Sequence, residues 1–375
     1  MQDAFLLPAL ATAHSHAFQR AMRGSAQRPG PLGTDDFWSW RTAMYSLAET
    51  LSPESIYTIA AVAYRKLFQQ GVRTVGEFHY VHHQPDGTPY DDRTILSDQV
   101  IQAARDEGLR IALLRVVYTR AGAGRAPEGA QRRFSDPNLD LAFADVEKLR
   151  ARWASDAGVS IGIAPHSVRA VPPAWLAPIA SFASTHGLMV HAHVAEQPAE
   201  IAACLAETGK RPVELLAEQG LLGPRFVAVH ATHLAPHEPR LLGEAQAFVC
   251  LCPTTERDLG DGLPDVSAMR ASGVRLSAGV DSHVMTAPLE DLRAIDLGER
   301  LRTQKRVTVR SDKRTPAEEL WRVGSTLSAQ ACGFSDAGGL VEIDLDVPEL
   351  RLVQPEFRLD AIVFSGGTGI FRKTT

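Results

Sequence analysis

Histidines that could bind a metal ion occur in two closely spaced pairs. His14 and His16 form one pair, and His191 and His193 form the other. In a β-strand, residues i and i+2 point to the same side, so the two imidazoles of a pair can reach one ion. A single pair would more often be a core or loop feature. Two pairs together with His230 favour a metal site.

Most of these histidines end short apolar segments of the kind that forms buried parallel strands. The segments are rich in Val, Ile, Leu and Ala and show little polar alternation. They are Leu10–Ala13, Thr74–Phe78, Arg110–Val117, Ser160–Ala164, Met189–Val194, Phe226–Ala231, Phe248–Leu251 and Val274–Ala278. Helical patterns lie between them. This order predicts an α/β fold, a (β/α)8 TIM barrel, rather than an open sheet.

The C-terminal ends of barrel strands meet at one mouth, where reactive groups gather. We therefore expect His14, His16, His193 and Asp281 to bind one metal ion. Asp281 alone would be an ordinary turn residue, but it follows the eighth segment. Three imidazoles and a carboxylate suit Zn²⁺, although Fe²⁺ or Mn²⁺ could use the same ligands. The fourth strand, through Ile161–His166, has no lysine to bridge two ions, so one ion per chain is expected.

Two further residues could carry protons in a hydrolytic reaction. Glu196 lies three residues after His193 and could act as a general acid or base. The alternative is an exposed acid at the start of a helix. His230 ends the sixth segment and is its natural partner. For His79, His82 and His83, which follow the second segment, the expectation is a solvated loop.

The composition limits the function classes and the compartment. Hydrophobic residues make up 45% and charged residues 22% of the 375 residues, and the net charge is -5. This balance is typical of a globular protein and gives no sign of a nucleic-acid or membrane partner. Four cysteines, Cys204, Cys250, Cys252 and Cys332, are too few and too irregularly spaced for a disulfide framework. Neither a signal peptide nor a long apolar stretch is apparent, so a cytoplasmic location is expected.

Several longer segments resemble the amidohydrolase superfamily and, within it, the formimidoylglutamate deiminases. They are HSHAFQRAMRG, GEFHYVHH, GIAPHSVRAV, HAHVAEQ, VHATH, CPTTERDLGDGLPD and DSHV. The resemblance extends from about Pro8 to Glu299. It implies hydrolysis of N-formimidoyl-L-glutamate to N-formyl-L-glutamate and ammonia with one zinc ion, a reaction of histidine degradation. It also allows a homodimer.

The resemblance assigns further roles. Glu196 and His230, helped by Asp281, would move protons. The residues that would hold the substrate are Gln19, Arg41, Tyr80, His166 and Arg169. The two arginines would bind carboxylates of a small-molecule substrate through paired hydrogen bonds. From the residues alone, neither arginine differs from a surface one.

Two alternatives remain open at this stage. One is another mononuclear deaminase of the superfamily, acting on a guanidino acid or a nucleobase. The other is a catalytically silent barrel that serves as a scaffold. The arginine pair favours an acidic substrate.

The resemblance also predicts a division of the chain. Residues 8–335 would form the barrel, with a lid and a helix in the insert between His16 and Gly71. Residues 1–7 and 336–375 would form the remnant of a composite β-sandwich, an incomplete appendage. The apolar runs of Leu340–Thr375 are expected to be its strands, with exposed edges near Leu340–Phe364.

Overall fold

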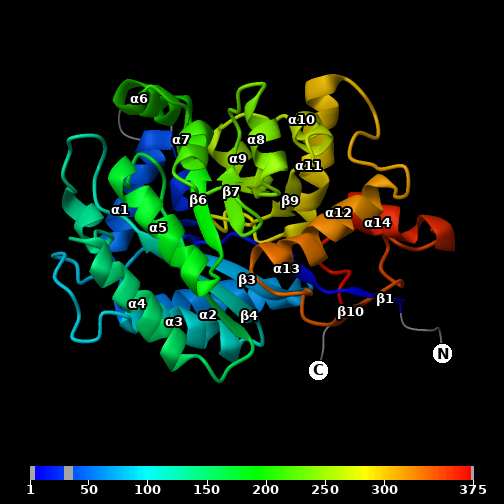
Figure 1. Ribbon diagram of the computed structural model, residues 1–375. Helices are drawn as coiled ribbons and strands as arrows, with labels where there is room; N and C mark the ends of the chain where they lie inside the picture. Colours follow the sequence, from blue (N-terminus) through cyan, green and yellow to red (C-terminus); the bar gives the residue numbers. More distant parts are fainter. Residues whose placement is uncertain (1–4, 29–36, 373–375) are drawn as a thin grey trace.

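A parallel eight-stranded sheet forms the centre of the molecule (Figure 1). The computed structural model describes residues 5–28 and 37–372. In sheet order the strands are β2 (Leu10–Thr12), β3 (Val72–His79), β4 (Arg110–Val117), β5 (Val159–Pro165), β6 (Val190–Val194), β7 (Phe226–His230), β8 (Phe248–Leu251) and β9 (Arg275–Ala278). Each corresponds to one predicted segment, so the expected barrel is confirmed.

The barrel is closed by contacts between its first and last strands. The backbone N–H of Ala13, just after β2, donates to the carbonyl of Ala278 at 2.8 Å. Ser15 and Asp281 form a parallel bridge beyond the strand ends. Nearly every strand residue is buried, because the sheet is covered on both faces. That double burial explains the absence of polar alternation in the sequence.

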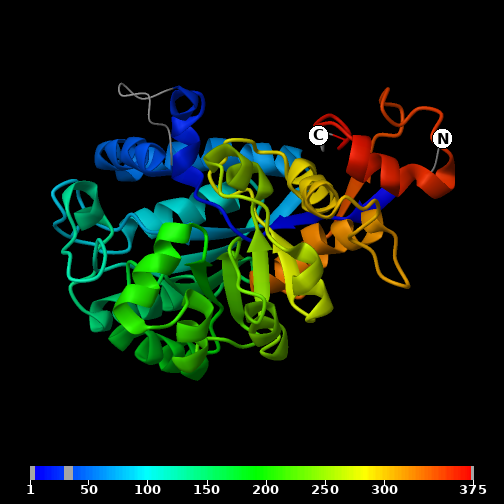
Figure 2. The same ribbon diagram turned by 90° about the horizontal axis from the view of Figure 1, so that it is seen from above.

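Helices surround the sheet (Figures 1 and 2). They are α2 (Pro53–Gln69), α3 (Ile95–Asp106), α4 (Leu139–Arg152), α5 (Pro173–His186), α6 (Pro198–Thr208), α7 (Pro212–Glu218), α8 (Glu238–Glu244), α9 (Pro253–Leu259), α10 (Val266–Ala271) and α11 (Pro288–Thr303). Local signals set their ends. The Ser52 side chain caps α2 by accepting the Ser55 N–H, and Gly187 ends α5 at a φ of 65°. Within the described part of the chain, no helix has the length and apolar character that crossing a membrane requires.

The insert between β2 and β3 covers the mouth of the barrel. After two short 3-10 helices, η1 (Ala17–Met22) and η2 (Ser25–Gln27), it forms α1 (Phe37–Thr50) and then α2. The side chains of Phe37, Trp40 and Arg41 in α1 line a cavity at that mouth. The insert thus contributes one wall of this cavity.

A small second sheet lies beside the barrel. In it β1 (Phe5–Pro8) pairs antiparallel with β10 (Leu340–Ile343). Between β9 and β10 the chain is largely helical, with α12 (Pro316–Arg322), the π-helical turn η4 (Val323–Leu327) and α13 (Ser328–Ala331) following α11. Residues 1–4 and 373–375 of the predicted appendage lie outside the described residues.

The prediction of strands throughout Leu340–Thr375 is wrong in part. Beyond β10 the main elements are η5 (Pro355–Phe357) and the helix α14 (Arg358–Ser365), which packs against α11 and α12. Leu359, Ile362 and Val363 are spaced three and four residues apart, which places them on one face of a helix. The apolar run was too short for its period to be distinguished from that of a strand.

Candidate active site and metal centre

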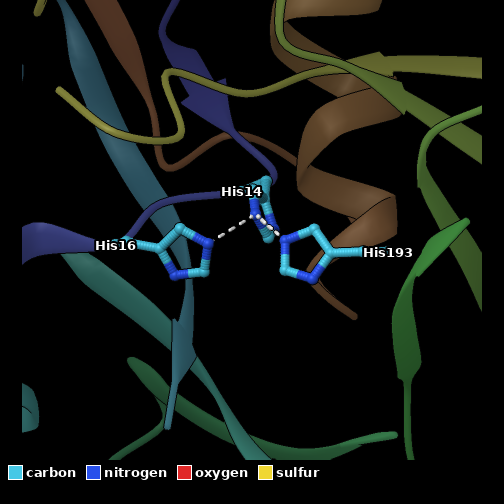
Figure 3. Close-up of side chains that lie close together, drawn as sticks. All are labelled: His14, His16 and His193. Carbon is cyan, nitrogen blue, oxygen red and sulfur yellow. Dashed lines mark hydrogen bonds between the residues drawn. The ribbon is translucent and has the colours of Figure 1, made fainter. Parts of the chain in front are cut away.

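Three imidazoles and one carboxylate converge at the C-terminal mouth of the barrel. The Nε2 atom of His14 lies 3.2 Å from Nε2 of His16 and 3.2 Å from Nε2 of His193 (Figure 3). Asp281 Oδ1 lies 3.4 Å from His14 Nε2 and 3.3 Å from His16 Nε2. The structure therefore brings together all four residues that the sequence predicts as ligands. They come from the ends of β2, β6 and β9.

The chemistry of these donors fits a divalent cation. The Nδ1 of His16 faces the Phe78 carbonyl at 2.9 Å, and the Nδ1 of His193 faces the His166 carbonyl at 3.1 Å. A carbonyl only accepts, so each Nδ1 carries the proton and each Nε2 presents a lone pair. His14 Nε2 lies close to both of these Nε2 atoms but has at most one proton, so it can donate to only one of the two. The separations of 3.2–3.4 Å between donor atoms are short enough for neighbouring donors to bind one ion.

Burial keeps protons off the imidazoles. It lowers the pKa of His14 to about 3 and lowers the pKa of His193 well below its ordinary value. Burial alone would raise the pKa of Asp281, but the hydrogen bond to His14 and the nearby histidines lower it. All these groups are therefore in their metal-binding form at neutral pH.

Hydrogen bonds behind the four residues hold their backbone in place. The His16 N–H donates to the Asp281 carbonyl at 2.9 Å, and the Asp281 N–H donates to the His14 carbonyl at 3.1 Å. The Ser15 hydroxyl donates to Glu77 Oε2 at 2.6 Å and lies 2.9 Å from His283 Nε2. Asp281 has a φ of 52°, a strained value for a residue other than glycine. The surrounding bonds maintain that strained conformation.

A second cluster contains the groups expected to carry protons. His230 Nε2 lies 3.7 Å from Glu196 Oε1 and 3.8 Å from Asp281 Oδ2, and its Nδ1 lies 3.2 Å from Glu256 Oε1. Burial would lower the pKa of His230, but the charge of Glu196 and the hydrogen bond to Glu256 raise it well above its ordinary value. Burial raises the pKa of Glu196, whose side chain is only 14% exposed. The alternative of an exposed acid at a helix start does not fit this position.

A cavity opens above both clusters. It is lined by His16, Gln19, Phe37, Trp40, Arg41, Met44, Tyr45, Tyr80, Tyr118, Phe134, His166, Arg169, His193, Glu196, His230, Leu259 and Asp281. Every predicted site residue is among them except His14, which is fully buried beneath. The five expected substrate contacts therefore lie on the same cavity as the candidate metal centre.

Two buried polar atoms of residues that line this cavity have no hydrogen-bond partner within the described part of the chain. They are Arg169 Nη1 and Gln19 Oε1, although Gln19 Nε2 donates to the Tyr80 hydroxyl at 2.8 Å. The Arg41 guanidinium lies over the Tyr45 ring, 5.0 Å from its centroid. Buried polar groups normally find partners, so those without one are available to a ligand. Two guanidinium groups would favour an anionic one.

The sequence interpretation missed some residues and misjudged others. His79, His82 and His83 are buried, so the expectation of a solvated loop is wrong; the Nε2 of His82, for example, faces the Val116 carbonyl at 2.9 Å. Glu256, in α9, was not singled out although it contacts His230. The segment CPTTERDLGDGLPD contains it, but no spacing rule connects it to the strand ends.

Comparisons with known proteins agree with this geometry. The Amidohydrolase family model matches residues 5–344. Formimidoylglutamate deiminase of Pseudomonas aeruginosa is 38% identical over 374 residues, covering 96% of this chain and 81% of the relative. The 8-oxoguanine deaminase of the same organism is 28% identical, covering 96% and 76%. A crystal structure of an amidohydrolase from Brucella melitensis superposes with a TM-score of 0.89 at 32% identity, covering 98% and 84%. The chain belongs to the amidohydrolase family.

Proposed function

We propose that the protein hydrolyses N-formimidoyl-L-glutamate to N-formyl-L-glutamate and ammonia. One observation supports this proposal most strongly: three candidate metal ligands and two arginines lie on the same cavity. His16, His193 and Asp281 lie at its base, and the guanidinium groups of Arg41 and Arg169 line it as well. The similarity to the Pseudomonas aeruginosa deiminase supports the same substrate.

The metal in this proposal is a single zinc ion held by His14, His16, His193 and Asp281. Three neutral imidazoles with one carboxylate suit Zn²⁺, and Fe²⁺ or Mn²⁺ could occupy the same donors. When bound, the ion would lower the pKa of a water molecule and polarise the formimidoyl group.

The chain's own groups then move protons. The oxygen of water bonds to the formimidoyl carbon, and the bond from that carbon to the terminal nitrogen breaks. The two protons of water end on the departing ammonia. His230 holds the attacking water in line, because its raised pKa keeps it protonated at neutral pH, and Asp281 takes up the proton of that water. Glu196, whose pKa burial raises, delivers protons to the terminal nitrogen.

The substrate's two carboxylates account for the arginines. Arg169 would pair with one and Arg41 with the other, each through charge-assisted hydrogen bonds. Gln19 Oε1 has no partner within the described chain and would accept an N–H of the substrate. Burial and the neighbouring arginines lower the pKa of His166, so its ring would contact the substrate as a neutral donor or acceptor.

The test is ammonia release by the purified protein, measured for N-formimidoyl-L-glutamate, an N-guanidino acid and 8-oxoguanine. We expect turnover of the first, loss of turnover with a chelator and recovery on adding zinc. Arg169→Gln should raise KM for formimidoylglutamate by about ten-fold or more, because a charged hydrogen bond contributes about 1.5–3 kcal/mol. Preference for 8-oxoguanine, or an unchanged KM in this variant, would contradict the proposal.

The proposed setting is the cytoplasm. All four cysteines are buried and free, which suits a reducing compartment. Cys250 and Cys252 pack in the core at 0% exposure, so neither is available for redox chemistry at the surface.

A further inference from the structure

A second set of potential metal ligands lies next to the first and shares no residue with it. Glu196, His230 and Asp261 each offer one ligand atom, and these atoms lie within 4.8 Å of one another. We propose that these three residues, here named the outer cluster, bind a second divalent cation. We further propose that this second ion inhibits the reaction. That inhibitory role rests on the proposed function, because it depends on Glu196 and His230 carrying protons, whereas binding of the ion does not rest on it.

The donor atoms of the outer cluster are arranged to face a cation. His230 Nδ1 lies 3.2 Å from Glu256 Oε1, so the proton on Nδ1 is held there, and a bound cation would take the place of the proton on Nε2. That Nε2 lies 3.7 Å from Glu196 Oε1. Two carboxylates and one imidazole form a ligand set that suits zinc or manganese.

The side chain of Asp261 is a second, independent indication that a cation binds here. Asp261 is only 3% exposed, and its Oδ2 has no hydrogen-bond partner among the described residues. Its other oxygen accepts a hydrogen bond from Gln197 Nε2. A buried carboxylate oxygen without a partner carries a desolvation penalty that a bound cation would offset.

The charge balance around the outer cluster favours a cation. Four carboxylates, those of Glu196, Glu256, Asp261 and Asp281, surround the single imidazole of His230. A divalent ion would offset this excess of negative charge more fully than one imidazole can.

Occupation of the outer cluster would oppose the reaction. An ion bound to Glu196 and His230 would occupy the carboxylate oxygen and the Nε2 atom that otherwise hold and deliver protons. The same metal that activates the enzyme at the first centre would then inhibit it at higher concentration.

The binding test uses metal-free, full-length protein in equilibrium dialysis against rising Zn²⁺. We expect the wild type to bind a second, weaker equivalent. Asp261→Asn should weaken the binding of this equivalent by at least about ten-fold, since loss of a ligand costs at least as much as loss of an outer-shell partner. The new side chain retains an oxygen that can accept from Gln197. Asp258→Asn is the matched control, because Asp258 is nearby and belongs to none of the candidate ligand groups.

Two binding results would overturn the proposal. One is saturation of the wild type at a single equivalent. The other is an unchanged second equivalent in Asp261→Asn. Neither bears on the substrate, so the proposed function would stand in either case.

The activity test compares ammonia release at excess zinc with release at one equivalent, within each variant. Blocking a general acid or base costs about 10²–10⁴-fold, so at saturating excess zinc we expect at least about ten-fold less ammonia release in the wild type and in Asp258→Asn, and a clearly smaller decrease in Asp261→Asn. Equal inhibition of Asp261→Asn and the wild type would overturn the inhibitory role. Absence of turnover of formimidoylglutamate at one equivalent would instead count against the proposed function, with the dialysis result unaffected.

Discussion

Two histidines of the site are equally buried and have opposite proton affinities. His14 is 0% exposed and His230 is 1% exposed. The pKa of His14 is lowered to about 3 by burial, whereas the pKa of His230 is raised well above its ordinary value because Glu196 and Glu256 outweigh burial. At neutral pH the ring of His14 is therefore neutral, whereas the ring of His230 is protonated.

The difference comes from the neighbours rather than from burial. Around His14 lie two imidazoles and one carboxylate, Asp281. Three carboxylate groups, those of Glu196, Glu256 and Asp281, have an oxygen 3.2–3.8 Å from a ring nitrogen of His230. In a medium of low dielectric constant, each added negative charge stabilises the imidazolium strongly. Carboxylate number therefore divides the site into a part suited to a metal and a part suited to proton transfer.

The largest expected effect is loss of the metal side. His193→Asn should lose the tightly bound zinc equivalent and reduce turnover by at least about 10³-fold, because a metal ion contributes several kcal/mol to transition-state stabilisation. Metal analysis and ammonia release measure both. The matched control is His237→Asn, since the His237 side chain is 50% exposed and paired with Glu214. Retention of the tightly bound equivalent by His193→Asn would show that His193 is not a ligand.

On the proton side, Glu196→Gln should reduce kcat by about 10²–10⁴-fold, the usual contribution of a general acid or base. The tightly bound zinc equivalent should remain, because Glu196 does not belong to the His14, His16 and His193 group. Glu244→Gln is the control, since the Glu244 side chain is 64% exposed. Near-normal turnover with zinc bound would remove Glu196 from the mechanism.

A smaller effect is expected from removing one of the carboxylates that raise the pKa of His230. Glu256→Gln removes a charge and a hydrogen bond that raise the pKa of His230, so that pKa should fall. The limb of the pH–kcat profile that belongs to His230 should move to lower pH by the same amount. An unshifted profile would mean that Glu256 does not govern this histidine.

The smallest expected effect concerns the stability of the metal-free protein. His14 has a folded pKa of about 3 against an ordinary 6.5, so between these values the unfolded chain binds more protons and stability falls as the pH is lowered. For His230, with a raised folded pKa, stability falls as pH rises above 6.5. Each contributes up to about 1.4 kcal/mol per pH unit.

Urea denaturation across this pH range separates the two contributions. His14→Asn should flatten the acidic slope, and His230→Asn should flatten the alkaline one. Equal slopes in the two variants and the wild type would contradict the opposite proton affinities.

The sequence alone was enough for the barrel and for the positions of the four predicted ligands. These follow from local rules. A strand of period two brings His14 and His16 to one side, and parallel strands with helical connections bring their ends to one mouth. His193 and Asp281 could therefore be placed beside them from the order of segments alone.

Only the tertiary structure decided which groups surround each of these residues. Glu256 meets His230 across 26 positions of the chain, and burial of His82 depends on a carbonyl of β4. Arg358–Ser365 became a helix because α11 and α12 offer it a surface. Proton affinity depends on the number of charges within a few ångströms, and a linear pattern does not contain those distances.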